Sequence, residues 1–570
     1  MVKRTRNTFD GCILDVGTSK DGLVLWIQKE DGRTIPVKVA YRPVLYLHAM
    51  KGCHASNMSP FRLVRALKNM STVYDAKPVD RRVRLSDSHK KPVIEVKTRD
   101  RLAFRDLVNK FSINSNFELF NVDIPMFQKY LYESGLFPFA KGSFTVSKQG
   151  RSKFMLESHR LKDDRMNLVY HLPGFKVAWI HATPVHETAV ERHQFDNPIQ
   201  KISVRPYNEP YARFESSSKK LIEPLELERG FGMDDVEMLR ALVQHVRQQD
   251  PDFILTCGGD EFVFPYLCSR ASRVGVARDL TLSRNNRPLY QECFRVNNDG
   301  SSSFFSYGRI MRRSSTQYYL SGRLHIDTSN YGSLHYKDGN IPGLIEVARI
   351  SSVPVQRLNR ITIGGALQSI QFQIAHDRGI LIPRVKKSAE SFKSVKTLLQ
   401  ADRGGHIFEP RTGVFSNVIS IDFTSMYPMI MTKYNVSPET VNCSCCDDTT
   451  GEIIPGLNYH ICSKREGLIP ESIRIPLEKR IAYKHMARRL GDRGQKLELM
   501  QSALKWILVV SFGYLGFRNA RFGRVEAHQA VCAYSREMLL EAARIARERR
   551  FHVIHGIVDS LWVQDTDGTD

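Results

Sequence analysis

Two short apolar runs, each leading to an aspartate, constrain this chain more than any other feature. Residues 418–421 read as a strand that ends at Asp422, and a strand pair brackets residues 556–560, which contain Asp559. Because the two aspartates lie far apart in sequence, they can act together only if one sheet places their strands side by side. Such a pair of carboxylates can bridge two divalent ions, which is the arrangement that nucleotidyl transfer needs.

The basic composition indicates which kind of partner the chain binds. Its 570 residues carry a formal net charge of +23, which favours a polyanion such as nucleic acid because basic side chains release condensed counterions. The length predicts several domains, since one domain commonly has about 150 residues. No apolar signal core follows Met1 and no long uncharged apolar stretch is found, so we expect a cytoplasmic protein without a membrane partner.

The hydrophobic pattern predicts a multidomain chain of mixed α/β and α+β type. Alternating apolar runs near the start indicate antiparallel strands within an N-terminal α+β domain at residues 1–130. Residues 165–345 mix strands with helical stretches and are typical of an α/β domain. Two long helical patterns follow at residues 476–508, with a break near residues 491–494, and at residues 527–550.

The segment after the first aspartate, Asp422-Phe-Thr-Ser-Met-Tyr-Pro428, resembles motif A of the B-family DNA polymerases, whose pattern is D-x-x-S-L-Y-P. The resemblance implies that Asp422 is a metal ligand and that Tyr427 stacks under the incoming sugar and excludes a 2′-hydroxyl. The positions between them, Phe423, Ser425 and Met426, are then expected to help hold the metal and the triphosphate. The alternative is a Tyr-Pro turn that simply follows a core strand.

A second segment, Lys505-Trp-Ile-Leu-Val-Val-Ser-Phe-Gly-Tyr-Leu-Gly516, resembles motif B, the fingers-helix pattern K-x-x-x-N-S-x-Y-G. The resemblance implies that Lys505 neutralises triphosphate charge and that Gly513 permits close backbone approach to the nascent base pair. Val509 replaces the usual Asn and Phe512 the usual Tyr. Polar contacts near the nascent pair are therefore expected to be lost.

Two more basic residues stand in the helical pattern that precedes motif B. Arg480 and Lys484 are at i and i+4 and so share one face. In the family that face grips the phosphates of the nucleotide. The resemblance therefore implies fingers at residues 466–512, between two parts of a palm at residues 350–465 and 513–570.

The segment around the second aspartate, His555-Gly-Ile-Val-Asp-Ser-Leu-Trp562, resembles motif C, normally Y-G-D-T-D-S. Asp559 matches the second, metal-binding Asp, while Ile557 stands where the first is expected. One lost carboxylate reduces the negative charge that holds cations, which weakens metal binding without abolishing it. The resemblance implies two Mg²⁺ or Mn²⁺ ions at Asp422 and Asp559.

A fourth resemblance concerns proofreading. Residues 252–266 resemble the second exonuclease motif of the family, N-G-D-x-F-D-F-P-Y, which makes residues 165–345 a degenerate, RNase H-like 3′–5′ exonuclease domain. Val263 stands at the metal-binding Asp, and the strand expected to carry D-I-E-T reads Val177-Ala-Trp-Ile-His-Ala-Thr183. Apolar side chains offer no oxygen ligands, so we expect no exonuclease activity. Asp260 and Glu261 are expected to form loop hydrogen bonds and to be solvated.

Cysteines gather in an insertion of the palm at residues 443–462. Thiolates of Cys443, Cys446 and Cys462, with Cys445 or His460 as the fourth ligand, can hold a tetrahedral zinc ion. The alternative is a set of free thiols in a loop.

The order of these segments resembles archaeal B-family DNA polymerases over nearly the whole chain. Disrupted exonuclease motifs, V-D-S at motif C and a short length resemble their divergent second lineage, which is linked to tolerance of DNA damage. This implies a distributive polymerase that uses primer–template DNA and dNTPs and lacks proofreading. The chain ends eleven residues after Asp559, so a thumb is expected to be missing, or supplied by a separate polypeptide, and a sliding clamp is a further candidate partner.

A hypothesis from a different functional class stays open. Ile557, Val509 and Val263 also fit a noncatalytic DNA-binding or regulatory protein on a polymerase scaffold, or one part of a split polymerase. Against it, carboxylates repel phosphate unless a cation bridges them, so retention of Asp422 and Asp559 favours catalysis.

Overall fold

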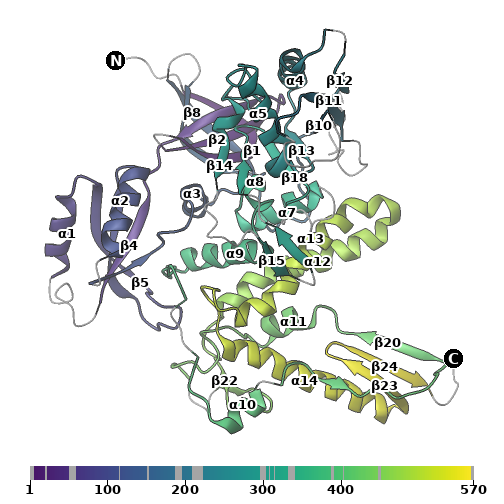
Figure 1. The fold of residues 1–570 in the computed structure, drawn as a ribbon. Coiled ribbons are helices and arrows are strands. Elements are labelled where there is room, and N and C mark those ends of the chain that lie inside the picture. The colour runs from purple at the N-terminus through teal and green to yellow at the C-terminus, as the bar shows by residue number, and fades with distance from the viewer. Residues whose placement is uncertain are drawn as a thin grey trace. The chain divides into compact units, whose positions relative to one another are not determined.

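The chain divides into two compact units that alternate along the sequence, and each is described by itself (Figure 1). Unit 1 comprises Met1–Tyr41, Pro125–Ala366 and Lys479–Leu504, and unit 2 comprises Arg42–Ile124, Leu367–Glu478 and Lys505–Asp570. The computed structural model describes residues 6–565 apart from 20–21, 51–58, 114–115, 150–152, 186–194, 208–221, 231, 296–302, 307–308, 313–314, 331–339, 387–389, 402 and 447–450.

Unit 1 begins with a closed barrel in the order β1-β2-β3-β9-β8. Inward side chains such as Ile13, Leu25 and Phe144 are buried and form its core together with residues of helix α3. The alternation of apolar and polar residues in these strands produces this one-sided burial. The bounds are β1 (Arg6–Ser19), β2 (Gly22–Lys29), β3 (Thr34–Val39), α3 (Met126–Ser134), β8 (Lys141–Gln149) and β9 (Lys153–Leu161).

The second part of unit 1 is a five-stranded sheet in the order β12-β11-β10-β13-β18, with β10, β13 and β18 parallel. Helix α4 starts at a capping box, in which Asp234 accepts from the backbone N–H of Glu237 and the Glu237 side chain accepts from that of Asp234. The bounds are β10 (Val177–Pro184), β11 (Ile199–Pro206), β12 (Leu225–Glu228), α4 (Asp235–Gln249), β13 (Phe253–Thr256), α5 (Phe264–Arg273), β14 (Cys293–Arg295), β15 (Ser303–Ser306), β16 (Arg309–Arg312), β17 (Thr316–Tyr318), β18 (Leu324–Asp327), α7 (Ile341–Ser351) and α8 (Val355–Leu358).

Unit 2 holds two four-stranded sheets. The first has the order β5-β6-β4-β7. Two isolated bridges, Arg82–Ile380 and Phe120–Pro383, connect this region to a later part of the chain. The bounds are β4 (Val44–Ala49), α1 (Pro60–Lys68), β5 (Val73–Arg81), β6 (Lys91–Thr98), α2 (Arg101–Ser112) and β7 (Phe117–Phe120).

The second sheet of unit 2, which we call the palm sheet, has the order β19-β23-β24-β20. Helix α14 lies along it in Figure 1, and Leu539, Ala543, Val553 and Leu561 form a buried core between helix and strands. The bounds are α10 (Val395–Ala401), β19 (Ile407–Phe408), β20 (Val418–Asp422), α11 (Met426–Lys433), β21 (Glu452–Ile453), β22 (His460–Ile461), α14 (Val525–Glu548), β23 (Phe551–Ile557) and β24 (Ser560–Asp565).

Three helices contain residues of both units: α9 (Ile363–Asp377), α12 (Leu468–Leu490) and α13 (Gln495–Gly516). A 3₁₀ turn at Gly491–Gly494 separates α12 from α13, and Gly491 has a φ of 55°, in the region that glycine tolerates best. The break is therefore as predicted, while the helices extend beyond the predicted range of 476–508 at both ends. By length and composition alone, the stretch Leu468–Gly516 is apolar enough to cross a membrane, a test that buried core helices also pass.

The mixed α/β and α+β multidomain fold expected from the sequence is confirmed. The structure adds the alternation of the two units, which no local sequence pattern indicates. Residues 6–41 and 42–124, both within the expected N-terminal domain, fall into different compact units.

Candidate two-metal active site

The palm sheet brings the two aspartates to the same end. Asp422 is the last residue of β20 and pairs with Ser560, the first residue of β24. Ser560 in turn pairs with Ile557, the last residue of β23, so Val558 and Asp559 form a two-residue turn between those strands. Neighbouring strands lie about 4.8 Å apart. The turn that carries Asp559 therefore lies next to the strand end that carries Asp422.

Hydrogen bonds hold the carboxylate of Asp422 and the backbone of Asp559. The Ser560 hydroxyl donates to Asp422 Oδ1 at 2.9 Å, and the backbone N–H of Phe423 donates to the Asp559 carbonyl at 2.8 Å. Partial burial, together with the negative charge of Asp422, raises the pKa of Asp559 above its usual range. Two oxygen donors whose charges repel each other suit a divalent cation, which would favour the ionised form of both.

The turn that presents Asp559 is strained. Val558 has a φ of 51°, which is unusual for a β-branched residue and normally belongs to glycine at this turn position. Its backbone N–H donates to the His406 carbonyl at 2.9 Å. A Cβ added at Gly405 would come within 2.9 Å of the Val558 side chain. Gly405, which our sequence reasoning missed, therefore leaves room for this turn.

An aromatic stack supports Tyr427. Its ring centroid lies 4.2 Å from that of Phe512 on α13, and Phe512 lies 4.1 Å from His528 on α14. The Tyr427 hydroxyl oxygen lies beside Gly405, and a Cβ added at Gly405 would come within 3.2 Å of it. Burial raises the pKa of Tyr427, so this hydroxyl stays protonated at neutral pH.

The other motif A residues take different places. Met426 is 3% exposed and its sulfur accepts from the Ser535 hydroxyl at 3.5 Å, so its side chain belongs to the core. Phe423 packs against the core beneath the palm sheet. Ser425 has a φ of 53° at the start of α11. Any contact of Phe423 or Met426 with a nucleotide would therefore come from the backbone.

The motif B residues lie on one exposed face of α13. Lys505, Val509 and Gly513 recur at intervals of four, and all three are exposed. A Cβ added at Gly513 would meet no atom within 4 Å, so the helix surface is open there. This face and the carboxylates belong to the same compact unit.

Arg480 and Lys484 belong to the part of α12 within unit 1. Both are half-buried, and burial lowers the pKa of Arg480. The preceding residue, Lys479, is buried, donates to the Arg165 carbonyl at 2.7 Å and pairs with Glu346 at 2.7 Å. Lys479 anchors this stretch of helix, a role that its position in a helical pattern did not reveal.

The five-stranded sheet β12-β11-β10-β13-β18 lies in the segment that resembles an exonuclease domain, and we call it the exonuclease-like sheet. Just after its strand β13, Asp260 forms a buried ion pair. Asp260 is 0% exposed, so the expectation that it is solvated is wrong. Both of its oxygens accept from Arg360, at 2.7 and 3.0 Å, and one accepts from the backbone N–H of Tyr318 at 2.8 Å. The neighbouring His325 is fully buried, which lowers its pKa to about 4. Protein donors therefore occupy the Asp260 carboxylate.

The remaining positions at this sheet end are also engaged within the fold. Val263 is 1% exposed and belongs to the hydrophobic core of the exonuclease-like sheet. Asp327 accepts from the backbone N–H groups of Gly258 and Asp260, at 2.9 and 2.8 Å. These contacts are those of a packed structural domain.

The four clustered cysteines lie close together in unit 2. Their sulfur atoms are all within 4.8 Å of one another, which makes the group Cys443, Cys445, Cys446 and Cys462 a possible metal site. His460 Nε2 lies 3.6 Å from Cys443 Sγ and is not one of the four.

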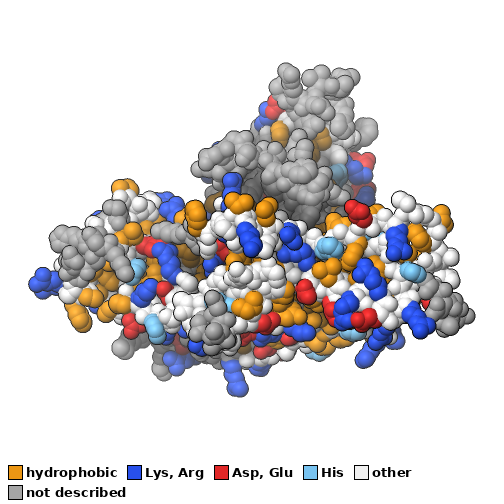
Figure 2. Space-filling view, turned by 90° about the horizontal axis from the view of Figure 1, so that it is seen from below, with side chains coloured by type: hydrophobic (Ala, Val, Ile, Leu, Met, Phe, Trp, Pro, Cys, Tyr) orange, Lys and Arg blue, Asp and Glu red, His pale blue; other side chains and the backbone are white. Residues whose placement is uncertain are grey.

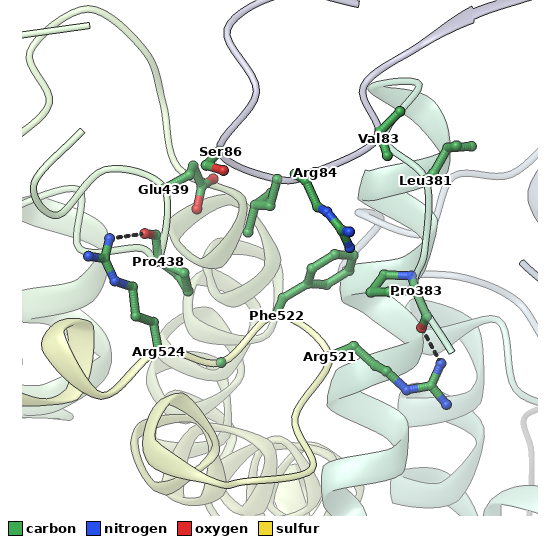
Figure 3. Close-up of a pocket in the computed structure, with 12 residues that line it drawn as sticks. Val83, Arg84, Ser86, Leu381, Pro383, Pro438, Glu439, Arg521, Phe522 and Arg524 are labelled. Carbon is green, nitrogen blue, oxygen red and sulfur yellow. Dashed lines mark hydrogen bonds between the residues drawn. The ribbon is translucent and has the colours of Figure 1, made fainter. Parts of the chain in front are cut away.

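A separate cavity of about 470 Å³ in unit 2 is lined by Arg84, Arg521 and Arg524 (Figure 3). The guanidinium groups are already engaged. Arg84 pairs with Glu118, Arg521 donates to the Pro383 carbonyl and pairs with Asp123, and Arg524 pairs with Glu526 and donates to the Pro438 carbonyl. The cavity therefore offers no surplus positive charge to an anion.

Comparison with family models gives the deciding observation. Residues 362–565 match the model of DNA polymerase family B, and residues 173–338 match the exonuclease domain of the same family. The chain belongs to DNA polymerase family B. The first match contains the palm sheet with both aspartates, and the second contains the buried Asp260.

Several curated relatives of this family B chain are archaeal. DNA polymerase 2 of Saccharolobus solfataricus is 37% identical over 222 residues, which cover 39% of this chain and 33% of the relative. DNA polymerase 1 of Pyrococcus abyssi is 26% identical over 364 residues, which cover 57% and 46%. The matched regions thus span from a third to less than half of these relatives.

A solved structure shares the fold. The family B DNA polymerase from Pyrobaculum calidifontis matches with a TM-score of 0.73 at 19% sequence identity, covering 98% of this chain and 75% of that one. At this identity the match shows a shared fold only. The chemistry of this family B chain has to be inferred from its own residues.

The buried ion pair predicts a stability difference between two neighbouring acidic residues. Asp260→Ala leaves Arg360 buried without its carboxylate, so we expect a loss of about 3–5 kcal/mol in the free energy of unfolding. Glu261 is exposed, so the control Glu261→Ala is expected to stay within about 0.5 kcal/mol of the parent. Chemical denaturation followed by circular dichroism measures both, and equal values would contradict the structural role of Asp260.

The register of the palm sheet predicts that a third carboxylate can be restored. Ile557, Ser560 and Asp422 pair across three adjacent strands, so their side chains lie on one face, and Ile557 is 38% exposed. Ile557→Asp is expected to bind Mn²⁺ on the order of tenfold more tightly, a gain of about 1.4 kcal/mol. Ile557→Asn is the control of equal shape without charge. Equal affinities in titration calorimetry would show that position 557 does not face the ions.

Proposed function

We propose that this chain catalyses template-directed DNA synthesis. The 3′-hydroxyl of a primer attacks the α-phosphorus of a deoxynucleoside triphosphate, a new phosphodiester bond forms and pyrophosphate leaves. The observation that carries the proposal is the placement of Asp422 and Asp559 at one end of the palm sheet. When bound there, two Mg²⁺ or Mn²⁺ ions would activate the attacking hydroxyl and stabilise the charge on the leaving group.

The remaining residues of the proposed site hold the nucleotide. Tyr427, supported by Phe512, offers a flat surface beneath the sugar and excludes a 2′-hydroxyl. Lys505 is exposed and neutralises charge on the triphosphate, and Gly513 leaves space beside the nascent base pair. Arg480 and Lys484 contribute positive charge from α12, which we assign to the same phosphates.

Duplex DNA is the proposed partner, with dNTPs as substrates. The net charge of +23 supports binding of a polyanion. On the face drawn in Figure 2, Lys and Arg side chains are spread among hydrophobic side chains, together with Asp and Glu side chains. A broad distribution of this kind fits contact along a phosphate backbone and carries no sequence information.

We further propose that synthesis is distributive and lacks proofreading, and that it serves damage tolerance or repair in the cytoplasm. The engagement of Asp260 by Arg360 and the packed Val263 support the absence of exonuclease chemistry. A thumb-bearing polypeptide or a sliding clamp would supply additional DNA contacts. A separate Zn²⁺ ion at the four cysteines completes the proposed cofactors.

One alternative function has an observation in its favour. Ile557 and Val509 place exposed apolar side chains, 38% and 42% exposed, where the family carries Asp and Asn. A DNA-binding or regulatory protein on a polymerase scaffold, or one part of a split polymerase, would tolerate both. The two functions differ in whether the chain alone extends a primer.

Primer extension tests the proposal. Asp422→Asn and Asp559→Asn each remove one of the two negative charges, so each is expected to lower extension with Mg²⁺ or Mn²⁺ by about 10³-fold or more. The matched control is Asp106→Asn, because Asp106 is an exposed acidic residue of the same unit outside the palm sheet. Full DNA binding by the parent chain without any extension would favour the alternative.

A proofreading assay tests the exonuclease-like domain. With a mismatched primer end and Mg²⁺, the parent chain is expected to release no more nucleotide than a protein-free blank, because this sheet end presents no free carboxylate pair among the described residues. Digestion that co-purifies with the chain and is lost in the Glu261→Gln variant, which keeps the buried ion pair, would overturn this expectation.

A further inference from the structure

Four cysteine sulfurs converge between α11 and α12. Cys445 Sγ lies 3.5 Å from the sulfurs of both Cys443 and Cys462, and Cys446 Sγ lies 3.8 Å from that of Cys462. A tetrahedron of sulfurs around one zinc ion, with Zn–S bonds of about 2.3 Å, has edges of about 3.8 Å. None of the described cysteines forms a disulfide. The observed spacing is therefore that of ligands around a single ion.

We propose that Cys443, Cys445, Cys446 and Cys462 bind one structural Zn²⁺ ion. Thiolates suit zinc, and four protein ligands leave no open position for substrate, which is typical of structural sites. The sequence left Cys445 and His460 as alternatives for the fourth ligand, and the geometry favours Cys445.

His460 has a different task in this arrangement. Its Nε2 lies 3.2 Å from the carbonyl oxygen of Cys443. A carbonyl can only accept a hydrogen bond, so Nε2 carries the proton and donates, and a protonated nitrogen has no lone pair for zinc. His460 thus orients the backbone of a ligand residue from outside the first coordination shell.

The fold already brings the ligand-bearing segments together. The backbone N–H of Cys462 donates to the Thr440 carbonyl at 2.9 Å, and that of Asn442 donates to the His460 carbonyl at 2.9 Å. Between α11 and α12 the described residues form only the two short strands β21 and β22, each of two residues. A region with so little regular structure gains most from a cross-link, and an ion held by four ligands supplies one.

Residues 435–442, which lead into the cysteine cluster, cap the first turn of α12. Glu439 Oε1 accepts from the backbone N–H of Leu468 at 2.6 Å, and Ser437 Oγ accepts from that of Ile469 at 3.2 Å. Asn435 bridges the two regions, since its side-chain amide donates to the Cys462 carbonyl at 3.1 Å and its oxygen accepts from Gly467 at 2.7 Å. The ion would therefore stabilise the segment that satisfies the orphan N–H groups of this helix.

The first test is the metal content of the full-length chain, purified under reducing conditions without chelator and measured by mass spectrometry for zinc and iron together. We expect about one zinc per chain, as four ligands fill one tetrahedral site. Cys445→Ser, Cys446→Ser and Cys462→Ser are expected to lose at least about nine tenths of it. His460→Gln and Cys257→Ser, a control at an exposed cysteine outside the cluster, are expected to retain it.

A second measurement reports the ligands themselves. After exchange of the bound metal for Co²⁺, the visible and near-ultraviolet spectrum is expected to show tetrahedral coordination with sulfur-to-cobalt charge transfer in the parent chain and in His460→Gln. Circular dichroism of each variant confirms that the rest of the chain is folded, so loss of zinc is not mistaken for loss of the protein.

Several results would overturn the proposal. They are a parent chain that stays nearly zinc-free after reconstitution with Zn²⁺, iron in place of zinc, a disulfide within the cluster in non-reducing peptide mapping, or zinc retained by Cys445→Ser. Because Asp422→Asn is expected to keep its zinc, failure of the polymerase proposal and failure of the zinc proposal give different results.

Discussion

The hydrogen-bond register between β20 and β24 is the constraint on which the candidate active site depends. Five residue pairs, from Val418–Gln564 to Asp422–Ser560, fix this register. A slip of one residue would turn Asp422 to the opposite face of the sheet. The apolar core beneath the strands therefore decides where the charges lie, because it rewards only the register that buries Val553, Leu561 and Val563 against α14.

Features that depend on local periodicity could be predicted from the sequence. The strand that ends at Asp422, the helix predicted at 527–550 and observed as Val525–Glu548, and the break at Gly491–Gly494 all follow from the spacing of apolar residues and glycines. The approach of Asp559 to Asp422 was also predicted, because two apolar runs that each lead to a carboxylate have few ways to share one sheet. The roles of these residues in catalysis stay predictions.

Features that depend on distant partners could not be predicted. Asp260 stands in a loop-like segment, and nothing local shows that Arg360, a hundred residues later, neutralises it in the core. The sequence around Lys479 is that of an ordinary exposed helical lysine. Only the structure shows that it is buried against Glu346 and two backbone carbonyls. Gly405 could be seen in the sequence, but the structural reason for a glycine there, the side chain of Val558, lies in a distant strand turn. Such contacts arise from tertiary packing, which composition and periodicity do not encode.

The alternation of the two compact units along the chain has a consequence for biosynthesis. Unit 2 is assembled from residues 42–124, 367–478 and 505–570. During translation, the first of these segments emerges roughly 240 residues before the second, which at about 5–20 residues per second is a delay on the order of ten to fifty seconds. In that interval the sheet of β4 to β7 exists without its partners in unit 2. Nascent chains of this length would therefore be the stage most dependent on chaperones.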